Sequence, residues 1–208
     1  MLRSLARGQG NQPPTAPGGC SATTTPRIAL TSIAMPGLLA FHAHPDDEVT
    51  STGGTLAKYA EAGEQVVVVT ATDGAEGEVH NYENVDEIKA RLTEVRAEEI
   101  ADALDILGVK HHEFLGYRDS GMMGEEANKH PECFWAADFD EAVGKMVKLI
   151  RHYQPEVMTI YDPFGGYGHP DHIQVHRVGS AAAELVDGVR VLEATVNRDA
   201  LGDFVAAA

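Results

Sequence analysis

Three short segments of this chain are apolar at nearly every position, and they restrict the possible folds more than any other feature. They cover residues 38–43, 65–71 and 157–161, and the second reads QVVVVTA. Runs of this length, rich in β-branched residues, are typical of strands that are covered on both faces. The pattern therefore predicts a mainly parallel sheet that is buried between layers of helices.

The segments between these runs have the periodicity of amphipathic helices and end at residues that usually stop helices, such as Gly63 and Gly108. Strands that alternate with helices predict the α/β class, with a three-layer Rossmann-like fold, a mainly parallel sheet and helices on both faces. We expect helices over residues 53–62, 86–107, 139–150 and 173–186, and further strands over residues 112–115 and 189–196.

The chain has 208 residues, enough for one domain with a substantial core. Residues 1–34 are rich in Gly, Pro, Ser and Thr and lack apolar periodicity, which predicts a disordered N-terminal extension before a domain over residues 35–208. The first 45 residues contain no Asp or Glu, so a targeting sequence and a functional arm remain alternatives. A targeting sequence is disfavoured because the apolar stretch at 28–34 is short and broken.

The formal net charge of −16 argues against a nucleic-acid partner and against an anionic membrane surface. No apolar run approaches the roughly 20 residues of a membrane span. Two cysteines, Cys20 and Cys133, are too few for a disulfide framework and favour a reducing cytoplasm. A nucleotide-binding domain is disfavoured because no GxGxxG follows the first expected strand.

Two dense polar clusters directly follow two of the apolar runs. They read FHAHPDDE at 41–48 and GGYGHPDH at 165–172. A single His-Pro-Asp sequence is compatible with an ordinary turn, and an acidic run with the solvated start of a helix. Ligands of parallel sheets bind beyond the carboxyl ends of the strands, however, and both clusters are expected there. We therefore predict one metal site that is assembled from both.

Histidine nitrogen and carboxylate oxygen are ligands that zinc prefers, and a catalytic zinc keeps three protein ligands plus a water. His44 and Asp47 can converge if the chain turns into a helix at Pro45, and His172 can supply the third ligand. Asp46 is then free to take a proton from zinc-bound water, whose pKa is brought to about 7. Ferrous iron would also suit these ligands.

The second cluster offers groups for the rest of an amide hydrolysis. His169 could donate a proton to a leaving amine, with Asp171 holding its tautomer and raising its pKa. Tyr167 could stabilise an oxyanion, although a packing role in a glycine-rich loop is the alternative. His42 is interpreted as a strand side chain and not as a ligand.

These motifs resemble those of the PIG-L/LmbE-like de-N-acetylases, and most closely the mycothiol branch with its inositol-glucosamine deacetylase and mycothiol conjugate amidase. The resemblance runs from about Leu38 to Arg198 and includes GAEGEV at 74–79, RAEEIADALDILGV at 96–109 and YRDSGM at 117–122. It implies zinc-dependent hydrolysis of an N-acyl amide on a small glucosamine-type sugar.

The resemblance also implies roles for individual residues. It places zinc on His44, Asp47 and His172 and the base on Asp46, with Tyr167 and His169 at the oxyanion and the leaving group. It further implies that Arg96 and Asp119 meet the polyol part of the substrate and that Met122 lines the pocket.

The expected reaction is removal of an N-acetyl group from an N-acetylglucosamine-type compound, such as N-acetylglucosaminyl-inositol. One alternative is a mycothiol S-conjugate amidase, which the region at 133–135 resembles. The chain ends ten residues after Arg198, earlier than members of this branch. A C-terminal truncation is therefore one interpretation, and a non-catalytic metal- or sugar-binding domain is the alternative of another class. The sequence does not indicate the oligomeric state.

Overall fold

The computed structural model describes residues 37–80, 82–195 and 197, so the expected N-terminal extension lies outside the described residues. The described strands form one sheet in the order β3-β2-β1-β4-β5, and every pairing in it is parallel. The predicted α/β class with a parallel sheet is confirmed. The strands are β1 (Leu38–His42), β2 (Val66–Thr72), β3 (His111–Tyr117), β4 (Val157–Tyr161) and β5 (Arg190–Ala194).

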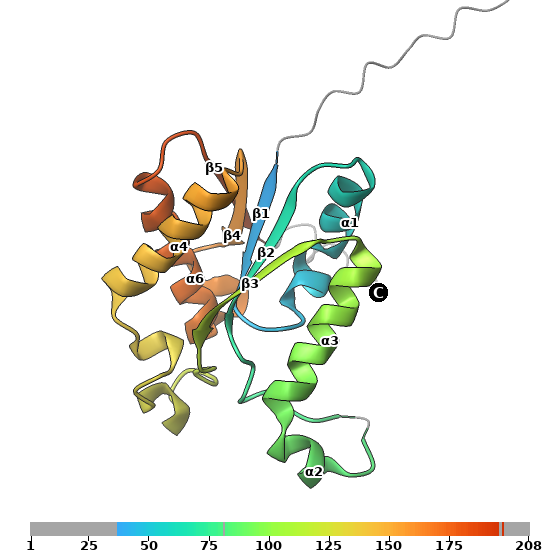
Figure 1. The fold of residues 1–208 in the computed structure, drawn as a ribbon. Helices are drawn as coiled ribbons and strands as arrows, with labels where there is room; N and C mark the ends of the chain where they lie inside the picture. Colours follow the sequence, from blue (N-terminus) through green and yellow to red (C-terminus); the bar gives the residue numbers. More distant parts are fainter. Residues whose placement is uncertain (1–36, 81, 196, 198–208) are drawn as a thin grey trace, which may run out of the picture. The chain divides into compact units, whose positions relative to one another are not determined.

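Helices cover both faces of this sheet, which makes three layers (Figure 1). Helices α1 and α3 lie on one face, and α4 and α6 lie on the other. The bounds are α1 (Gly53–Glu61), α2 (Val85–Ala90), α3 (Leu92–Leu107), α4 (Phe139–Tyr153), α5 (Gly165–Gly168) and α6 (Pro170–Glu184), with shorter turns η1 (Glu48–Thr52), η2 (Glu126–Lys129) and η3 (Phe134–Ala136).

Successive residues of β1 belong to two different hydrophobic cores. Leu38 and Ala40 pack with apolar side chains of α1 and α3, whereas Leu39 and Phe41 pack with those of α4 and α6. Side chains alternate between the two faces of a strand, so a central strand covered on both faces must be apolar throughout. This accounts for the apolar run from which the parallel sheet was predicted.

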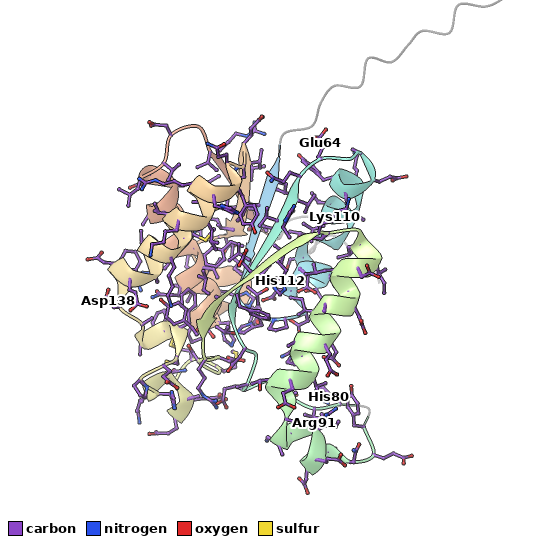
Figure 2. All side chains as sticks on the ribbon, in the orientation of Figure 1. Glu64, His80, Arg91, Lys110, His112 and Asp138 are labelled. Atoms are coloured by element: carbon purple, nitrogen blue, oxygen red, sulfur yellow. The ribbon has the colours of Figure 1, made fainter. Side chains whose placement is uncertain are left out.

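The single helix expected over residues 86–107 is wrong, because α2 and α3 are separate helices. Arg91 breaks them with φ −128° and ψ 28°, and Figure 2 labels it at their junction. Ile88 of α2 packs with Leu92, Val95 and Val79 in a small cluster of its own, apart from the sheet. The break at Arg91 lies within this cluster, between Ile88 and Leu92.

Smaller differences concern the ends of elements. The helix expected from residue 173 begins at Pro170, and the strand expected over 112–115 extends from His111 to Tyr117. The last strand ends at Ala194, and residue 196 lies outside the described residues. Among the helices in the described ranges, none is long and apolar enough to cross a membrane.

The strand order reverses between β1 and β4. From β1 the chain first adds β2 and β3 on one side, and it later adds β4 and β5 on the other. In open parallel sheets such a reversal opens a crevice beyond the carboxyl ends of the two strands. The two polar clusters follow β1 and β4, so the topology brings segments about 120 residues apart in sequence to the same crevice.

Candidate metal centre

Three side-chain atoms meet in the crevice between β1 and β4. Nδ1 of His44 lies 3.4 Å from Oδ2 of Asp47 and 3.3 Å from Nε2 of His172. The third edge, from His172 Nε2 to Asp47 Oδ2, is 3.4 Å. All three residues are buried. We call this group the His44–Asp47–His172 triangle.

The dimensions of the triangle fit a tetrahedral divalent cation. Zinc bonds of about 2.0–2.1 Å in a tetrahedral site place neighbouring ligand atoms about 3.3–3.4 Å apart. The three atoms cannot all satisfy one another, because a carboxylate has no proton to donate and a neutral imidazole carries only one. A cation coordinated by the three would satisfy them together.

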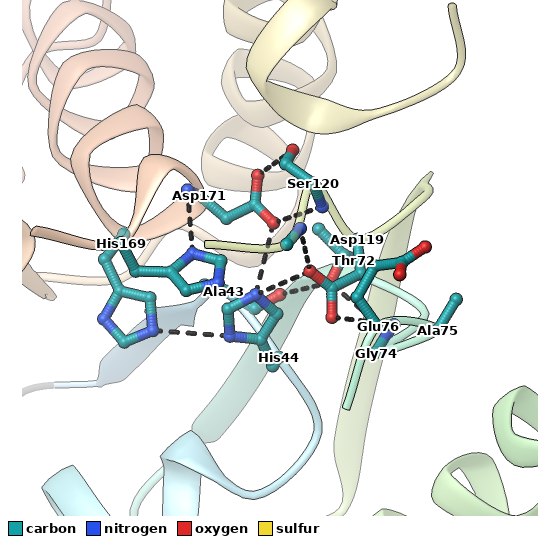
Figure 3. A network of polar contacts seen from close by, with 12 residues as sticks. Ala43, His44, Thr72, Gly74, Ala75, Glu76, Asp119, Ser120, His169 and Asp171 are labelled. Carbon is teal, nitrogen blue, oxygen red and sulfur yellow. Dashed lines mark hydrogen bonds and ion pairs between the residues drawn. The ribbon is translucent and has the colours of Figure 1, made fainter. Parts of the chain in front are cut away.

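The second ring nitrogen of His44 faces carboxylates. Nε2 of His44 lies 3.2 Å from Oδ2 of Asp171 and 3.5 Å from Oδ1 of Asp119, and Figure 3 shows both contacts. These acceptors place the imidazole proton on Nε2, which leaves the Nδ1 lone pair for a metal.

The electrostatics of this position also favour a positive charge. Burial lowers the pKa of His44, but the hydrogen bonds to Asp119, Asp171 and Asp47 outweigh it and raise this pKa well above its usual range. The surroundings of His44 therefore stabilise a cation in the crevice.

A tight turn, and not the expected helix start at Pro45, brings His44 and Asp47 together. The backbone N–H of Asp47 donates to the carbonyl of His44, and the N–H of His44 donates to Oδ2 of Asp47 at 2.9 Å. Asp46 has φ 121°, which no helix allows, and regular helical structure begins only after it. The prediction of a helix starting at Pro45 is wrong.

His172 is held by packing. Its ring stacks on that of Tyr161 at the end of β4, with centroids 4.2 Å apart and planes 14° apart. Gly165 has φ +62°, and a Cβ there would lie 2.6 Å from the Cβ of His172. Glycine is therefore required where the loop after β4 crosses the start of α6.

The carboxylate of Asp171 contacts residues other than His169. Its fully buried carboxylate accepts from the backbone N–H of Ser120 at 2.9 Å and from the Ser120 hydroxyl, and it faces His44. The contact with His169 is made by the Asp171 backbone N–H, which donates to His169 Nδ1 at 3.1 Å. Asp171 thus fixes the tautomer of His169, as was predicted, but it does so through its backbone N–H and not through its carboxylate.

His169 caps the N-terminus of α6 and borders the triangle. One of its ring nitrogens lies within 4.8 Å of those of His44 and His172. Burial and the neighbouring His44 lower the pKa of His169 to about 4, and they outweigh Asp171, which raises this pKa as was predicted. Because Nδ1 accepts from the backbone, a neutral His169 carries its proton on Nε2.

Tyr167 and Asp46 reach the same crevice from opposite loops. The Tyr167 hydroxyl lies 3.4 Å from Nε2 of His172, and partial desolvation together with the nearby Asp47 raises the pKa of Tyr167. Burial raises the pKa of Asp46, and the nearby Arg96 acts against that shift. At neutral pH the site thus offers a phenol O–H donor beside a carboxylate of increased basicity.

The crevice opens into a pocket of about 410 Å³, a size that suits a small molecule. Met122 and Tyr167 line it, and Met122 is 45% exposed. Asp119 also lines it, but its carboxylate contacts His44 and the backbone N–H groups of Glu76 and Gly121. A larger hollow of about 590 Å³ beside β3 contains none of the triangle residues.

Arg96 contacts the base candidate and its turn. Its Nη2 donates to the carbonyl of Pro45 at 2.7 Å and pairs with Asp46.

The interpretation of His42 as a strand side chain is confirmed, because its ring nitrogens form hydrogen bonds with the hydroxyl groups of Tyr161 and Thr52.

Sequence reasoning missed three supporting residues. Tyr161 stacks on His172, Ser120 holds Asp171, and Glu48 accepts from the backbone N–H of Asp46. Their positions beside the motifs were the available signal, because each directly precedes, follows or belongs to a segment that was singled out. Their partners are decided by the fold.

The fold and the triangle define an α/β protein with a candidate divalent-metal centre at the switch point of a parallel sheet. The sequence profile of the PIG-L family, described as GlcNAc-PI de-N-acetylase, matches residues 39–183. The chain belongs to the PIG-L family, as its motifs indicated.

Curated relatives carry a more specific description. The chain is 54% identical over 155 residues to a 1D-myo-inositol 2-acetamido-2-deoxy-alpha-D-glucopyranoside deacetylase of Catenulispora acidiphila, with 71% of this chain and 48% of the relative covered. It is 52% identical over 158 residues to the deacetylase of the same description from Streptomyces avermitilis, with 71% and 53% covered. The chain thus spans about half the length of the curated relatives it matches.

Solved structures share the fold with more varied functions. An N,N'-diacetylchitobiose deacetylase from Pyrococcus horikoshii matches with a TM-score of 0.57 at 25% identity, covering 72% of this chain and 50% of that one. A 4-carboxy-2-hydroxymuconate hydratase from Pseudomonas putida matches with a TM-score of 0.55 at 26% identity, covering 73% and 57%. The fold therefore supports more than one reaction, and the function must be argued from the site.

Proposed function

We propose that this protein is a zinc-dependent hydrolase that removes the N-acetyl group from an N-acetylglucosamine-type small molecule, such as N-acetylglucosaminyl-inositol. The observation that carries the proposal is the His44–Asp47–His172 triangle, whose edges of 3.3–3.4 Å match a tetrahedral zinc site. The curated relatives, described as deacetylases of an acetamido sugar linked to inositol, support the choice of substrate.

His44, Asp47 and His172 would hold the metal, and Asp171 and Asp119 would orient His44. Zinc in such a site supplies a Lewis acid and lowers the pKa of a water to about 7. The other groups that the reaction needs are side chains of the protein. Asp46, Tyr167 and His169 line the pocket beside the triangle.

The proposed hydrolysis uses three of these groups. Asp46 accepts a proton from the attacking water, whose oxygen bonds to the acyl carbon. The Tyr167 hydroxyl donates to the acyl oxygen as negative charge develops there. The amide C–N bond then breaks as Asp46 passes the proton that it took from water to the leaving amine nitrogen, which also accepts a hydrogen bond from Nε2–H of the neutral His169. The products are the free amino sugar and acetic acid, which ionises to acetate at neutral pH, and Asp46 is a carboxylate again.

The test compares the wild-type protein with Asp46→Ala, both reconstituted with zinc, in an assay of amine release from N-acetylglucosaminyl-inositol. We expect the variant to keep its zinc and to lose about 100- to 10,000-fold in kcat, because only the base is removed. Zinc content by mass spectrometry and circular dichroism serve as controls. Near-normal turnover of Asp46→Ala would show that the assignment of the base is incorrect.

The same assay separates the proposal from its alternatives. A mycothiol S-conjugate offered in parallel tests the amidase interpretation, which predicts faster cleavage of the conjugate. Failure of the wild-type zinc-loaded chain to release amine from any of a panel of N-acetylglucosaminides would favour a non-catalytic metal- or sugar-binding domain.

A further inference from the structure

Asp46 has a backbone conformation that an L-amino acid adopts only under constraint. Its φ of 121° lies in the region that favours glycine. A residue in such a conformation persists only where its surroundings fix it in several ways. The contacts that fix Asp46 should therefore be present around the turn between His44 and Asp47.

Two side chains hold the peptide group between Pro45 and Asp46 at its opposite ends. Nη2 of Arg96 donates to the carbonyl oxygen of Pro45 at 2.7 Å, and the N–H of Asp46 donates to Oε2 of Glu48 at 2.9 Å. The same Arg96 nitrogen also pairs with Oδ2 of Asp46. Arg96 thus fixes both the strained peptide and the carboxylate that it carries.

The side chain of Arg96 is itself enclosed by a loop with two glycines. A Cβ at Gly77 would lie 2.4 Å from Nη1 of Arg96, and one at Gly74 would lie 2.9 Å from Cδ. Gly74 also has φ +66°. The Arg96 side chain is 15% exposed, compared with 59% for Asp46. The loop backbone therefore approaches Arg96 so closely that only glycine fits at Gly77 without displacing it.

We propose that Arg96 is a positioning residue for Asp46, and that Gly74 and Gly77 form the seat that holds Arg96. The proposal rests on the proposed function, because it needs Asp46 as the base. Arg96 holds Oδ2 and leaves Oδ1 to take the proton from water. This role differs from contact with the polyol part of the substrate, which the family resemblance implied. It also gives a function to the glycines of the GAEGEV segment.

The first experiment measures steady-state amine release from N-acetylglucosaminyl-inositol by the full chain loaded with zinc. We expect Arg96→Ala to lower kcat by about 10- to 100-fold, with KM changed by less than about twofold and zinc content unchanged. Arg96→Lys keeps a charge without the fork of donors and should retain more kcat than Arg96→Ala. If Arg96→Ala does not fold, the kinetics of Arg96→Lys provide the test in its place.

A double-mutant cycle tests whether Arg96 acts through Asp46. Asp46→Asn should abolish most turnover, and Arg96→Ala added to it should cause no further loss in kcat beyond about twofold. Gly77→Ala tests the seat without removing Arg96, and we expect it to lower kcat about tenfold in the wild type but not in the Arg96→Ala background. Arg91→Ala, which removes an exposed arginine at the break before α3, is the matched control with wild-type kinetics.

Several outcomes would overturn the proposal. A rise in KM at constant kcat in Arg96→Ala would assign Arg96 to substrate binding. Independent losses in the double-mutant cycle would show that Arg96 does not act through Asp46. Full turnover in Asp46→Asn would refute the proposed function together with this inference, whereas loss in Asp46→Asn with normal kcat in Arg96→Ala would refute this inference alone.

Discussion

The two His-Pro-Asp sequences of this chain, at 44–46 and 169–171, are identical, but the corresponding residues make different contacts. In the first, His44 belongs to the triangle, and the Asp46 side chain is 59% exposed toward the pocket. In the second, His169 stays beside the triangle, and Asp171 is fully buried with its carboxylate on His44 and Ser120.

The backbone explains the difference. The first sequence forms a turn in which Asp46 takes φ 121° and its carboxylate pairs with Arg96 beside the triangle. In the second, Pro170 starts α6 and His169 is its N-cap, so Asp171 lies in the first helical turn and points inward. Only the residue three positions after each histidine, Asp47 or His172, joins the triangle in both cases. A short motif therefore does not assign roles until its backbone is known.

The largest expected effect separates the two clusters by metal binding. His172→Ala should lower zinc affinity by at least about a hundredfold, because it removes a direct ligand. His169→Ala should leave zinc bound, because His169 contributes no atom to the His44–Asp47–His172 triangle. Competition with a chromophoric chelator measures both affinities. Equal loss of zinc in the two variants would mean that His169 is a ligand as well.

The second effect distinguishes the two aspartates that follow the prolines. Asp171→Asn should lower zinc affinity about 10- to 100-fold, because the neutral amide supports His44 less well. Asp46→Asn should keep wild-type affinity while turnover is lost, because its carboxylate lies outside the triangle. The same chelator titration serves both. Should Asp46→Asn lose zinc and Asp171→Asn keep it, the assignment of ligand support and base would be reversed.

The smallest effect tests the backbone difference itself in metal-free protein. The free energy of unfolding of Asp46→Gly should exceed that of Asp46→Ala by about 1 kcal/mol, because φ 121° suits glycine. The free energy of unfolding of Asp171→Gly should be lower than that of Asp171→Ala by about 0.5–1 kcal/mol, because residue 171 is helical. Urea unfolding of the four variants measures both differences. The same order at both positions would show that Asp46 is not strained.

Some of this organisation could be predicted because it depends on local pattern. The apolar runs around Phe41 and Val68 predicted buried parallel strands, and the clusters predicted that His44, Asp47 and His172 would meet. The break at Arg91 could not be predicted, because the periodicity of Ile88, Leu92 and Val95 continues across it.

The sequence by itself determined the layered fold and the chemistry available at the ends of β1 and β4. Burial on both faces requires continuous apolar strands, and the two clusters contain the histidines and aspartates that can bind a metal. The tertiary structure decided which carboxylate serves which purpose: Asp171 supports His44 across 127 residues, and Arg96 holds Asp46 across 50. Such pairings depend on the strand order and on backbone angles imposed by distant contacts, and no local pattern encodes either.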